Sequence, residues 1–200
     1  ELIDFSTLDE VSLEANPATF DLAKAALFKE LGITRVSLGI QSFDAAVLQT
    51  LGREHDPAQA IRSVELLQEV GMPAVNIDLM FSIPHQSADS WHQTVQQAIA
   101  LKPQHISAYN LTYEEDTAFF KALLKGEMHD DPERNNARFY EADAALCAAG
   151  YEHYETSNYA QPGFRSSHNQ GYWRGEDYLG LGPSAVSTID SVRTQNVADT

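Results

Sequence analysis

The stretch that decides the fold is Val36-Ser-Leu-Gly-Ile-Gln-Ser-Phe-Asp44, an apolar run that carries the polar residue Gln41 at its end. Two similar runs flank it, Val11-Ser-Leu-Glu-Ala-Asn-Pro17 upstream and Val75-Asn-Ile-Asp-Leu-Met80 downstream. Each is rich in Val, Ile and Leu and precedes a helical pattern, which is typical of a parallel sheet with functional groups at the C-terminal ends of its strands. The polar residues of the three runs, Glu14, Gln41 and Asp78, predict a rim that suits a ligand with an amine and hydroxyl groups.

The rest of the chain continues the alternation of strand and helix as far as residue 112. We predict strands at 11–14, 35–40, 74–80 and 104–111, and helices at 19–31, 44–51, 57–70 and 87–101, joined by right-handed crossovers. Beyond residue 112 the pattern changes. It indicates helices at 117–124 and 132–149, a strand at 151–156, an irregular polar segment at 157–167, a tight turn at 180–183 and a strand-like run ending at Ile189.

Composition limits the classes of function. The 200 residues are 43% hydrophobic, enough for a core, and carry a net charge of −16, which argues against nucleic acid and anionic membranes as partners. No apolar run is long enough to span a membrane and the start does not resemble a signal peptide, so we expect a cytoplasmic protein. The single cysteine, Cys147, excludes an internal disulfide framework, and its apolar helical surroundings predict a place in the core.

The predicted fold class is α/β, a partial TIM-like barrel with a C-terminal α+β extension. Four βα units are too few to close a barrel, so we expect the first strands of the barrel to precede Glu1 in a longer protein. The barrel part is predicted at residues 1–115. Residues 116–200 form the extension, which we expect to continue beyond residue 200.

Six short motifs, each weak alone, occur together in one order. They are Glu14-Ala-Asn-Pro17, Gly39-Ile-Gln-Ser-Phe-Asp44, Leu51-Gly-Arg-Glu-His55, Asn76-Ile-Asp-Leu79, His105-Ile-Ser-Ala-Tyr-Asn-Leu-Thr-Tyr-Glu114 and His168-Asn-Gln-Gly-Tyr-Trp173. In this order they resemble the radical SAM family, in the branch of oxygen-independent coproporphyrinogen III oxidase and related haem chaperones. The resemblance implies a (β/α)6 barrel that holds S-adenosylmethionine beside a [4Fe–4S] cluster.

The resemblance assigns S-adenosylmethionine contacts to Glu14, Gln41, Arg53 and Asp78. The side chains suit this ligand, because Asp78 can accept hydrogen bonds from ribose hydroxyls and Arg53 can bind a carboxylate with two parallel donors. Gln41 offers both a donor and an acceptor. Any one of the four, taken alone, is better explained as a strand-end or loop residue that caps a helix or pairs on the surface.

The chain also departs from the family pattern. The cluster motif Cys-x3-Cys-x2-Cys is absent, and Cys147 alone cannot ligate a cluster, so we predict no metal site and no catalytic residue in this stretch. We expect an N-terminally truncated piece that does not cleave S-adenosylmethionine by itself, with the cluster in the full-length parent only. Ser82, Ser166 and Val186 replace a Gly, a Cys and a His that are usual in the family. These differences bear on the contacts made at the three positions more than on the assignment to the family.

The motif at residues 168–173 distinguishes the two branches. His168 and Tyr172 are four residues apart and share a helical face, and the resemblance implies that His168, Asn169, Tyr172 and Trp173 bind haem. Without the resemblance, a histidine that hydrogen-bonds locally beside two buried aromatic residues is the better explanation.

Three functions remain open at this level. The favoured one is a haem chaperone that binds S-adenosylmethionine and delivers haem to acceptor proteins. The second is coproporphyrinogen III oxidation, and the third is an inactive piece without the cluster. His153 and Glu155 share a predicted strand face but lack a third metal ligand at suitable spacing, so we interpret them as solvated.

Overall fold

The computed structural model describes residues 7–115, 117–126 and 128–198. The chain divides into two compact units, Glu1–Arg165 and Ser166–Thr200, which we call unit 1 and unit 2. The boundary predicted between residues 115 and 116 marks the end of the βα alternation and stays a prediction.

Unit 1 is built on a six-stranded sheet with the order β1-β2-β3-β4-β6-β5. The first four strands are parallel, β6 is antiparallel to β4, and β5 is antiparallel to β6. The strands are β1 (Ser12–Ala15), β2 (Arg35–Gln41), β3 (Ala74–Phe81), β4 (His105–Asn110), β5 (Glu152–His153) and β6 (Asn158–Ala160). This mostly parallel sheet confirms the predicted α/β class.

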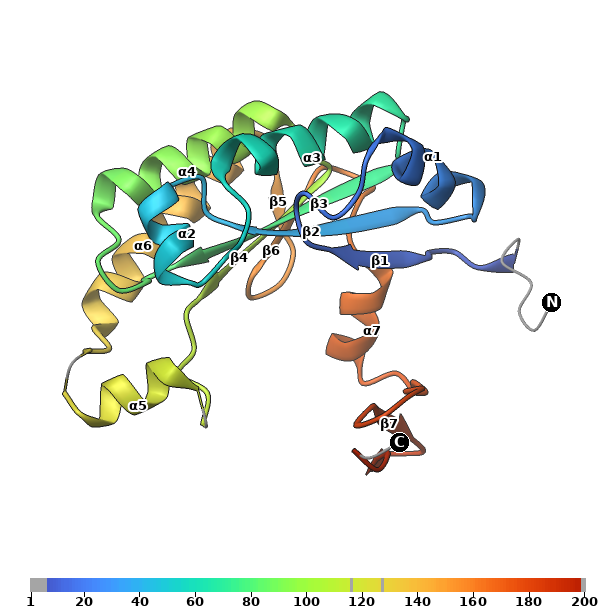
Figure 1. Cartoon of the computed structure of the whole chain (residues 1–200). Coiled ribbons are helices and arrows are strands. Elements are labelled where there is room, and N and C mark those ends of the chain that lie inside the picture. Colours follow the sequence, from blue (N-terminus) through green and yellow to red (C-terminus); the bar gives the residue numbers. More distant parts are fainter. Residues whose placement is uncertain (1–6, 116, 127, 199–200) are drawn as a thin grey trace. The chain divides into compact units, whose positions relative to one another are not determined.

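Helices cover one face of the sheet (Figure 1). The helices of unit 1 are α1 (Leu22–Glu30), α2 (Ala45–Thr50), α3 (Pro57–Glu69), α4 (Ala88–Leu101), α5 (Ala118–Leu124) and α6 (Pro132–Ala148). α3, α4 and α6 all contact β3, and α6 also contacts β4. Side chains from alternate strand positions fill the space beneath them, among them Val36, Leu38 and Ile40 of β2, which are fully buried.

Local sequence accounts for the helix starts. The Asp56 side chain accepts from the backbone N–H of Gln59, whose side-chain oxygen accepts from the backbone N–H of Asp56, and Pro57 occupies the first turn. At the start of α6, the Asp131 side chain accepts from the backbone N–H of Arg134, and Pro132 occupies the first turn. The predicted N-terminal limits of these two helices are therefore confirmed.

Three predictions in the second half of unit 1 are wrong. The strand expected at 151–156 is only the two-residue β5, and the segment expected to be irregular contains β6. Residues 152–160 form a hairpin instead, in which Tyr154 N–H donates to the Asn158 carbonyl. The turn lets β6 pair with β4, and this pairing stabilises the hairpin. Cys147 is exposed rather than buried, since Leu146 takes the core-facing position of α6 and Cys147 lies one residue around the helix.

Unit 2 consists of α7 (Ser167–Arg174) and a hairpin of β7 (Val186–Ile189) and β8 (Val192–Gln195). A Cβ atom added at Gly180 would overlap the backbone of Val186, so the predicted close backbone approach in the turn at 180–183 is confirmed. β8 was not predicted, because all four of its residues are exposed and give no periodic apolar signal. Within the described ranges, no helix combines the length and the apolar character needed to cross a membrane.

Candidate functional site

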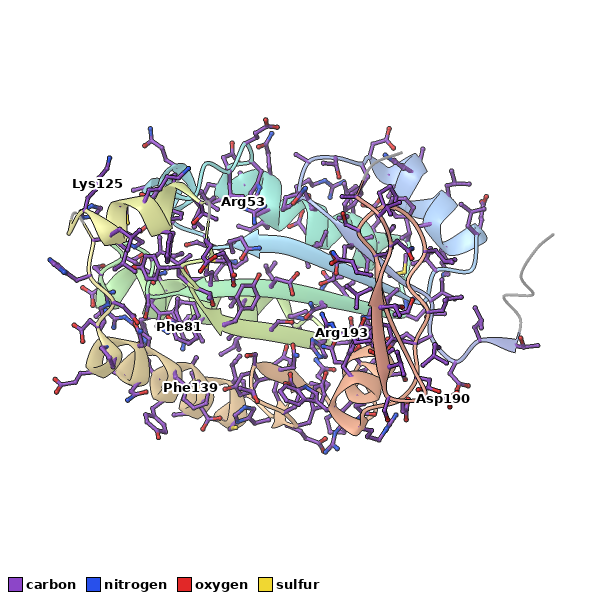
Figure 2. All side chains as sticks on the ribbon, turned by 90° about the horizontal axis from the view of Figure 1, so that it is seen from below. Arg53, Phe81, Lys125, Phe139, Asp190 and Arg193 are labelled. Atoms are coloured by element: carbon purple, nitrogen blue, oxygen red, sulfur yellow. The ribbon has the colours of Figure 1, made fainter. Side chains whose placement is uncertain are left out.

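The face of the sheet opposite the helices is polar. Successive strand residues point to opposite sides, so the residues between the buried Val, Leu and Ile positions all face away from the helices. We call this surface the polar face; Figure 2 looks onto it. Its strand residues are Glu14, Ser37, Gln41, Asn76, Asp78, His105, Ser107 and Tyr109. In a TIM-like barrel this face would line the interior, which is normally packed with branched apolar side chains. Its polar side chains are therefore better suited to contact a polar ligand.

Asp78 lies at the centre of the polar face with both carboxylate oxygens hydrogen-bonded. Ser37 Oγ donates to Oδ2 at 2.9 Å and Asn76 Nδ2 donates to Oδ1 at 2.7 Å. Burial raises the pKa of the Asp78 carboxyl above its usual range, whereas hydrogen bonds from Ser37, Ser107 and Asn76 lower it and the charge of Glu14 raises it. These three donors occupy three of the roughly four lone-pair positions of the carboxylate, which leaves room for a further donor.

Gln41 ends β2 in a strained conformation. Its φ is +69°, in the left-handed region that favours glycine, and the N–H of Ser42 donates to the Ile40 carbonyl across it at 2.8 Å. The side chain is 4% exposed, and Tyr109 donates its hydroxyl hydrogen to Gln41 Oε1 at 3.0 Å. Strain of this kind persists only where the surroundings enforce it, and it is concentrated at binding and catalytic sites.

Arg53 reaches the same region from the loop after α2, and it is labelled in Figure 2. Its Nη1 donates to Asn16 Oδ1 at 3.3 Å, which joins this loop to the end of β1. The next histidine, His55, is buried and its Nε2 lies 3.2 Å from the Ile40 carbonyl, beside the strained turn. Burial lowers the pKa of His55, so its ring is neutral at pH 7 and can donate to this carbonyl.

All four residues predicted to bind S-adenosylmethionine influence Tyr109, Gln41 through a hydrogen bond and Glu14, Arg53 and Asp78 through their charges. Burial raises the pKa of the Tyr109 hydroxyl first, the charges of Asp78 and Glu14 raise it further, and Gln41 and Arg53 lower it. Six neighbours were not predicted as site residues: Asn16, Ser37, Asn76, His105, Ser107 and Tyr109. Most carry a signal that was present in the sequence, polar residues that alternate with buried apolar ones at 35–41, 76–78 and 105–109, interrupted only by Gly39.

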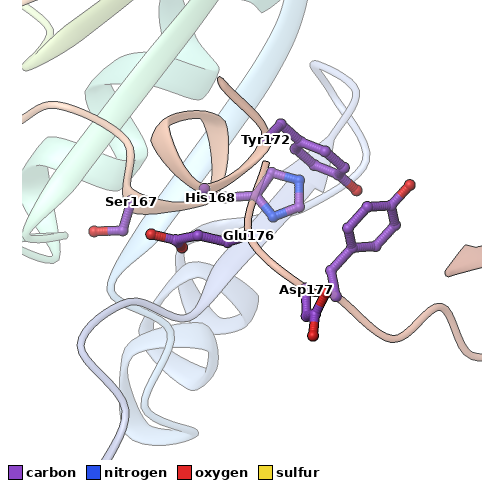
Figure 3. Close-up of a pocket in the computed structure, with 7 residues that line it drawn as sticks. Ser167, His168, Tyr172, Glu176 and Asp177 are labelled. Carbon is purple, nitrogen blue, oxygen red and sulfur yellow. The ribbon is translucent and has the colours of Figure 1, made fainter. Parts of the chain in front are cut away.

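The predicted haem residues lie on α7 in unit 2 (Figure 3). His168 and Tyr172 meet edge to face with ring centroids 4.8 Å apart, and Tyr178 meets Tyr172 at 4.6 Å. These rings line a pocket of about 160 Å³ together with Glu176 and other residues. The pocket is smaller than the roughly 300 Å³ at which sites for drug-sized ligands begin, so it has room for only part of a large ligand.

The other two residues predicted to bind haem, Asn169 and Trp173, do not line the pocket. The backbone N–H of Asn169 donates to Ser166 Oγ at 3.3 Å, so Asn169 lies in the capped first turn of α7. Trp173 is 63% exposed and does not line the pocket. Tyr178, which was not predicted as a haem residue, is the ring that lies beside Tyr172.

A [4Fe–4S] cluster does not fit the donors of this chain. The 200 residues contain one cysteine, whereas such clusters are held by several thiolates. Over residues 7–115, 117–126 and 128–198, no group of three or more His, Cys, Asp or Glu side chains could hold a metal ion. Cys147 lies on the surface of α6, where its Sγ is 3.8 Å from Asp143 Oδ1.

Residues 2–98 match the Radical SAM superfamily. The chain belongs to this superfamily. It is 36% identical to the haem chaperone HemW of Bacillus subtilis over 193 residues, 96% of this chain and 51% of that protein. It is 42% identical to HemW of Haemophilus influenzae over 183 residues, 92% of this chain and 47% of that one.

Other relatives extend this picture. A mitochondrial radical S-adenosyl methionine domain-containing protein 1 of Mus musculus is 37% identical over 177 residues, 88% of this radical SAM chain and 40% of that one. The chain spans about half the length of the HemW proteins it matches. The solved coproporphyrinogen III oxidase HemN of Escherichia coli superposes with a TM-score of 0.77 at 24% identity over 95% of this chain and 46% of that one. At that identity the likeness demonstrates the shared fold alone.

Proposed function

We propose that the polar face binds S-adenosylmethionine and that the chain is part of a haem chaperone of the HemW type. The main support for this ligand is the shared polar face, where Glu14 lies opposite Ser37, Ser37 donates to Asp78, Tyr109 donates to Gln41, and Arg53 bonds Asn16 at the end of β1. The similarity to HemW proteins, which covers nearly the whole chain, supports the chaperone branch. The likeness to HemN concerns the fold, so it does not favour the oxidase.

The side chains offer complementary groups to the different parts of this ligand. The Asp78 carboxylate has acceptor capacity left beside its three hydrogen bonds and can accept from a ribose hydroxyl. The Arg53 guanidinium can bind the methionine carboxylate, and the carboxylate of Glu14 is an acceptor for the amine. Gln41 Oε1 already accepts from Tyr109, so its amide nitrogen remains as a donor.

Equilibrium binding of S-adenosylmethionine to the chain tests this assignment. We expect Asp78→Asn to weaken binding by about 10- to 100-fold, because each hydrogen bond to a charged group contributes about 1.5–3 kcal/mol. Asp21→Asn is the matched control, since Asp21 caps α1 at an exposed position and Asn caps a helix equally well. Equal affinity of native protein, Asp78→Asn and Asp21→Asn would refute the site.

For haem, we propose that His168 supplies an axial ligand to the iron. A neutral imidazole is a common haem ligand, and the edge-to-face Tyr172 and Tyr178 rings offer apolar surface beside it. The absorption spectrum of the haem-loaded chain is expected to lose its histidine-ligated form in His168→Ala and to keep it in His129→Ala, an exposed position. A spectrum that is unchanged in His168→Ala would contradict this ligand.

The remaining expectations follow from this proposal. We expect the partners of the protein to be haem and the proteins that accept it, and we expect the protein to be located in the cytoplasm. The [4Fe–4S] cluster belongs to the full-length parent, because this stretch lacks its thiolates.

A further inference from the structure

A row of hydrogen-bonded side chains crosses the polar face and ends on Asp78. The Tyr154 hydroxyl lies 2.7 Å from His105 Nε2, and His105 Nδ1 lies 2.5 Å from Asn76 Oδ1. Asn76 Nδ2 in turn lies 2.7 Å from Asp78 Oδ1. The row therefore joins the turn between β5 and β6 to β4, β3 and the proposed ribose acceptor.

The chemistry of the groups fixes the direction of every hydrogen bond in this row. Asn76 places one amide atom 2.6 Å from Ser37 Oγ and 2.7 Å from an Asp78 oxygen, and only its NH2 group can donate to a carboxylate. The Asn76 oxygen then faces His105, so His105 Nδ1 must carry the ring proton. His105 Nε2 is left to accept from the Tyr154 hydroxyl, and every donor in the row points toward Asp78.

Burial protects the hydrogen bonds of this row from water. Asn76 is 5% exposed and His105 is 1% exposed, so water does not compete for these groups. Burial, aided by Arg35, lowers the pKa of His105 to about 3, which keeps the ring neutral and preserves the single-proton pattern at pH 7. In a medium of low polarity a row of aligned donors polarises each member, which strengthens the last bond to the carboxylate.

We propose that Asn76, His105 and Tyr154 are positioning residues that keep Asp78 ionised and aim its carboxylate at the ribose of the ligand. The proposal rests on the assignment of S-adenosylmethionine to the polar face. Burial and the charge of Glu14 both favour the protonated carboxyl, which has lost one of its acceptor sites, and the hydrogen bond from Asn76 opposes them together with those from Ser37 and Ser107.

The other titratable groups around Asp78 do not replace the row. Glu14 from β1 is a like charge, and Tyr109 from β4 donates to Gln41 instead. On β2 the neighbour is the neutral Ser37, while Arg35 pairs with Glu10 at 2.9 Å and acts on His105. Among the described residues, no Lys or Arg side chain lowers the Asp78 pKa, so the ionised carboxylate is stabilised by hydrogen-bond donors.

Carboxyl-carbon NMR titration of Asp78 in the ligand-free chain is the first test. Asn76→Ala is expected to raise the Asp78 midpoint by about one to two pH units, the equivalent of one lost charge-assisted hydrogen bond. Tyr154→Phe, a milder change that keeps the ring, is expected to raise it by a smaller amount in the same direction. Tyr151→Phe is the matched control, since its buried hydroxyl donates to the Pro103 carbonyl outside the row.

The pH dependence of S-adenosylmethionine binding is the second test. In the native chain affinity falls as pH drops through the Asp78 midpoint, and in Asn76→Ala this fall is expected at a pH higher by the same amount. A purely structural role would lower the affinity equally at every pH. An Asp78 midpoint that is the same in the native chain, Asn76→Ala and Tyr154→Phe would overturn the proposal.

The two tests separate this inference from the proposed function. If the native chain binds no S-adenosylmethionine while the Asp78 midpoint still moves in Asn76→Ala, the ligand assignment fails and the hold of the row on Asp78 stands. If binding is present and the midpoint does not move, the ligand assignment stands and the row is refuted.

Discussion

Acidification should destabilise unit 1 through His105. The ring is 1% exposed, and its pKa is about 3 in the folded chain against 6.5 for an ordinary histidine. The unfolded chain therefore binds a proton at a pH where the folded chain does not. The stability contributed by the neutral ring is fully present above pH 6.5, is lost as pH falls through the window between 6.5 and about 3, and is gone below it.

The size of the effect follows from the same two values. Each pKa unit corresponds to about 1.36 kcal/mol, so the ceiling for this residue is about 5 kcal/mol, reached near pH 3. At pH 5 the loss is about 2 kcal/mol, because the unfolded state is then mostly protonated and the folded state is not. A domain is typically stable by only about 5–15 kcal/mol, so a loss of this size is measurable.

Urea unfolding at pH 7 and at pH 5, monitored by circular dichroism, measures this loss of stability. His105→Gln removes the titrating group, so we expect this variant to be less stable at pH 7 but to lose about 2 kcal/mol less than the native chain between the two pH values. The difference between the two chains cancels His55, whose pKa is also lowered, while any change at Asp78 is measured separately by its NMR titration. His129→Gln, at an exposed position, should retain the native pH dependence. If His105→Gln also retains it, the reasoning is refuted.

Three further outcomes are expected. Trp91→Ala should cost about 3–5 kcal/mol in urea unfolding, because the ring is fully buried against Phe81 and its N–H donates to the Arg138 carbonyl. Gly180→Ala should loosen unit 2, since the new Cβ overlaps the Val186 backbone; limited proteolysis should then cut residues 166–200 faster while unit 1 stays resistant. Cys147 should react with maleimide in the folded chain, slowly because burial and Asp143 raise its pKa, and a thiol that reacts only after unfolding would contradict its exposed position.

Much of unit 1 could be predicted because its signals are local. Apolar runs located β2 and β3, and Asp-Pro pairs located the starts of α3 and α6. The placement of Cys147 failed because α6 carries many small apolar residues, so its amphipathic pattern does not single out the buried face. The hairpin of β5 and β6 failed because its pairing with β4 is decided across a long sequence separation.

The site divides in the same manner. The order of the motifs was enough to select Glu14, Gln41, Arg53 and Asp78, and with them the radical SAM superfamily. Only the tertiary structure placed Tyr109 among these four and joined Tyr154, His105 and Asn76 to Asp78. The physical reason is that residue type and periodicity are properties of neighbours in the chain. Which polar groups share a hydrogen bond depends on strand register and on burial, and these arise when distant segments pack together.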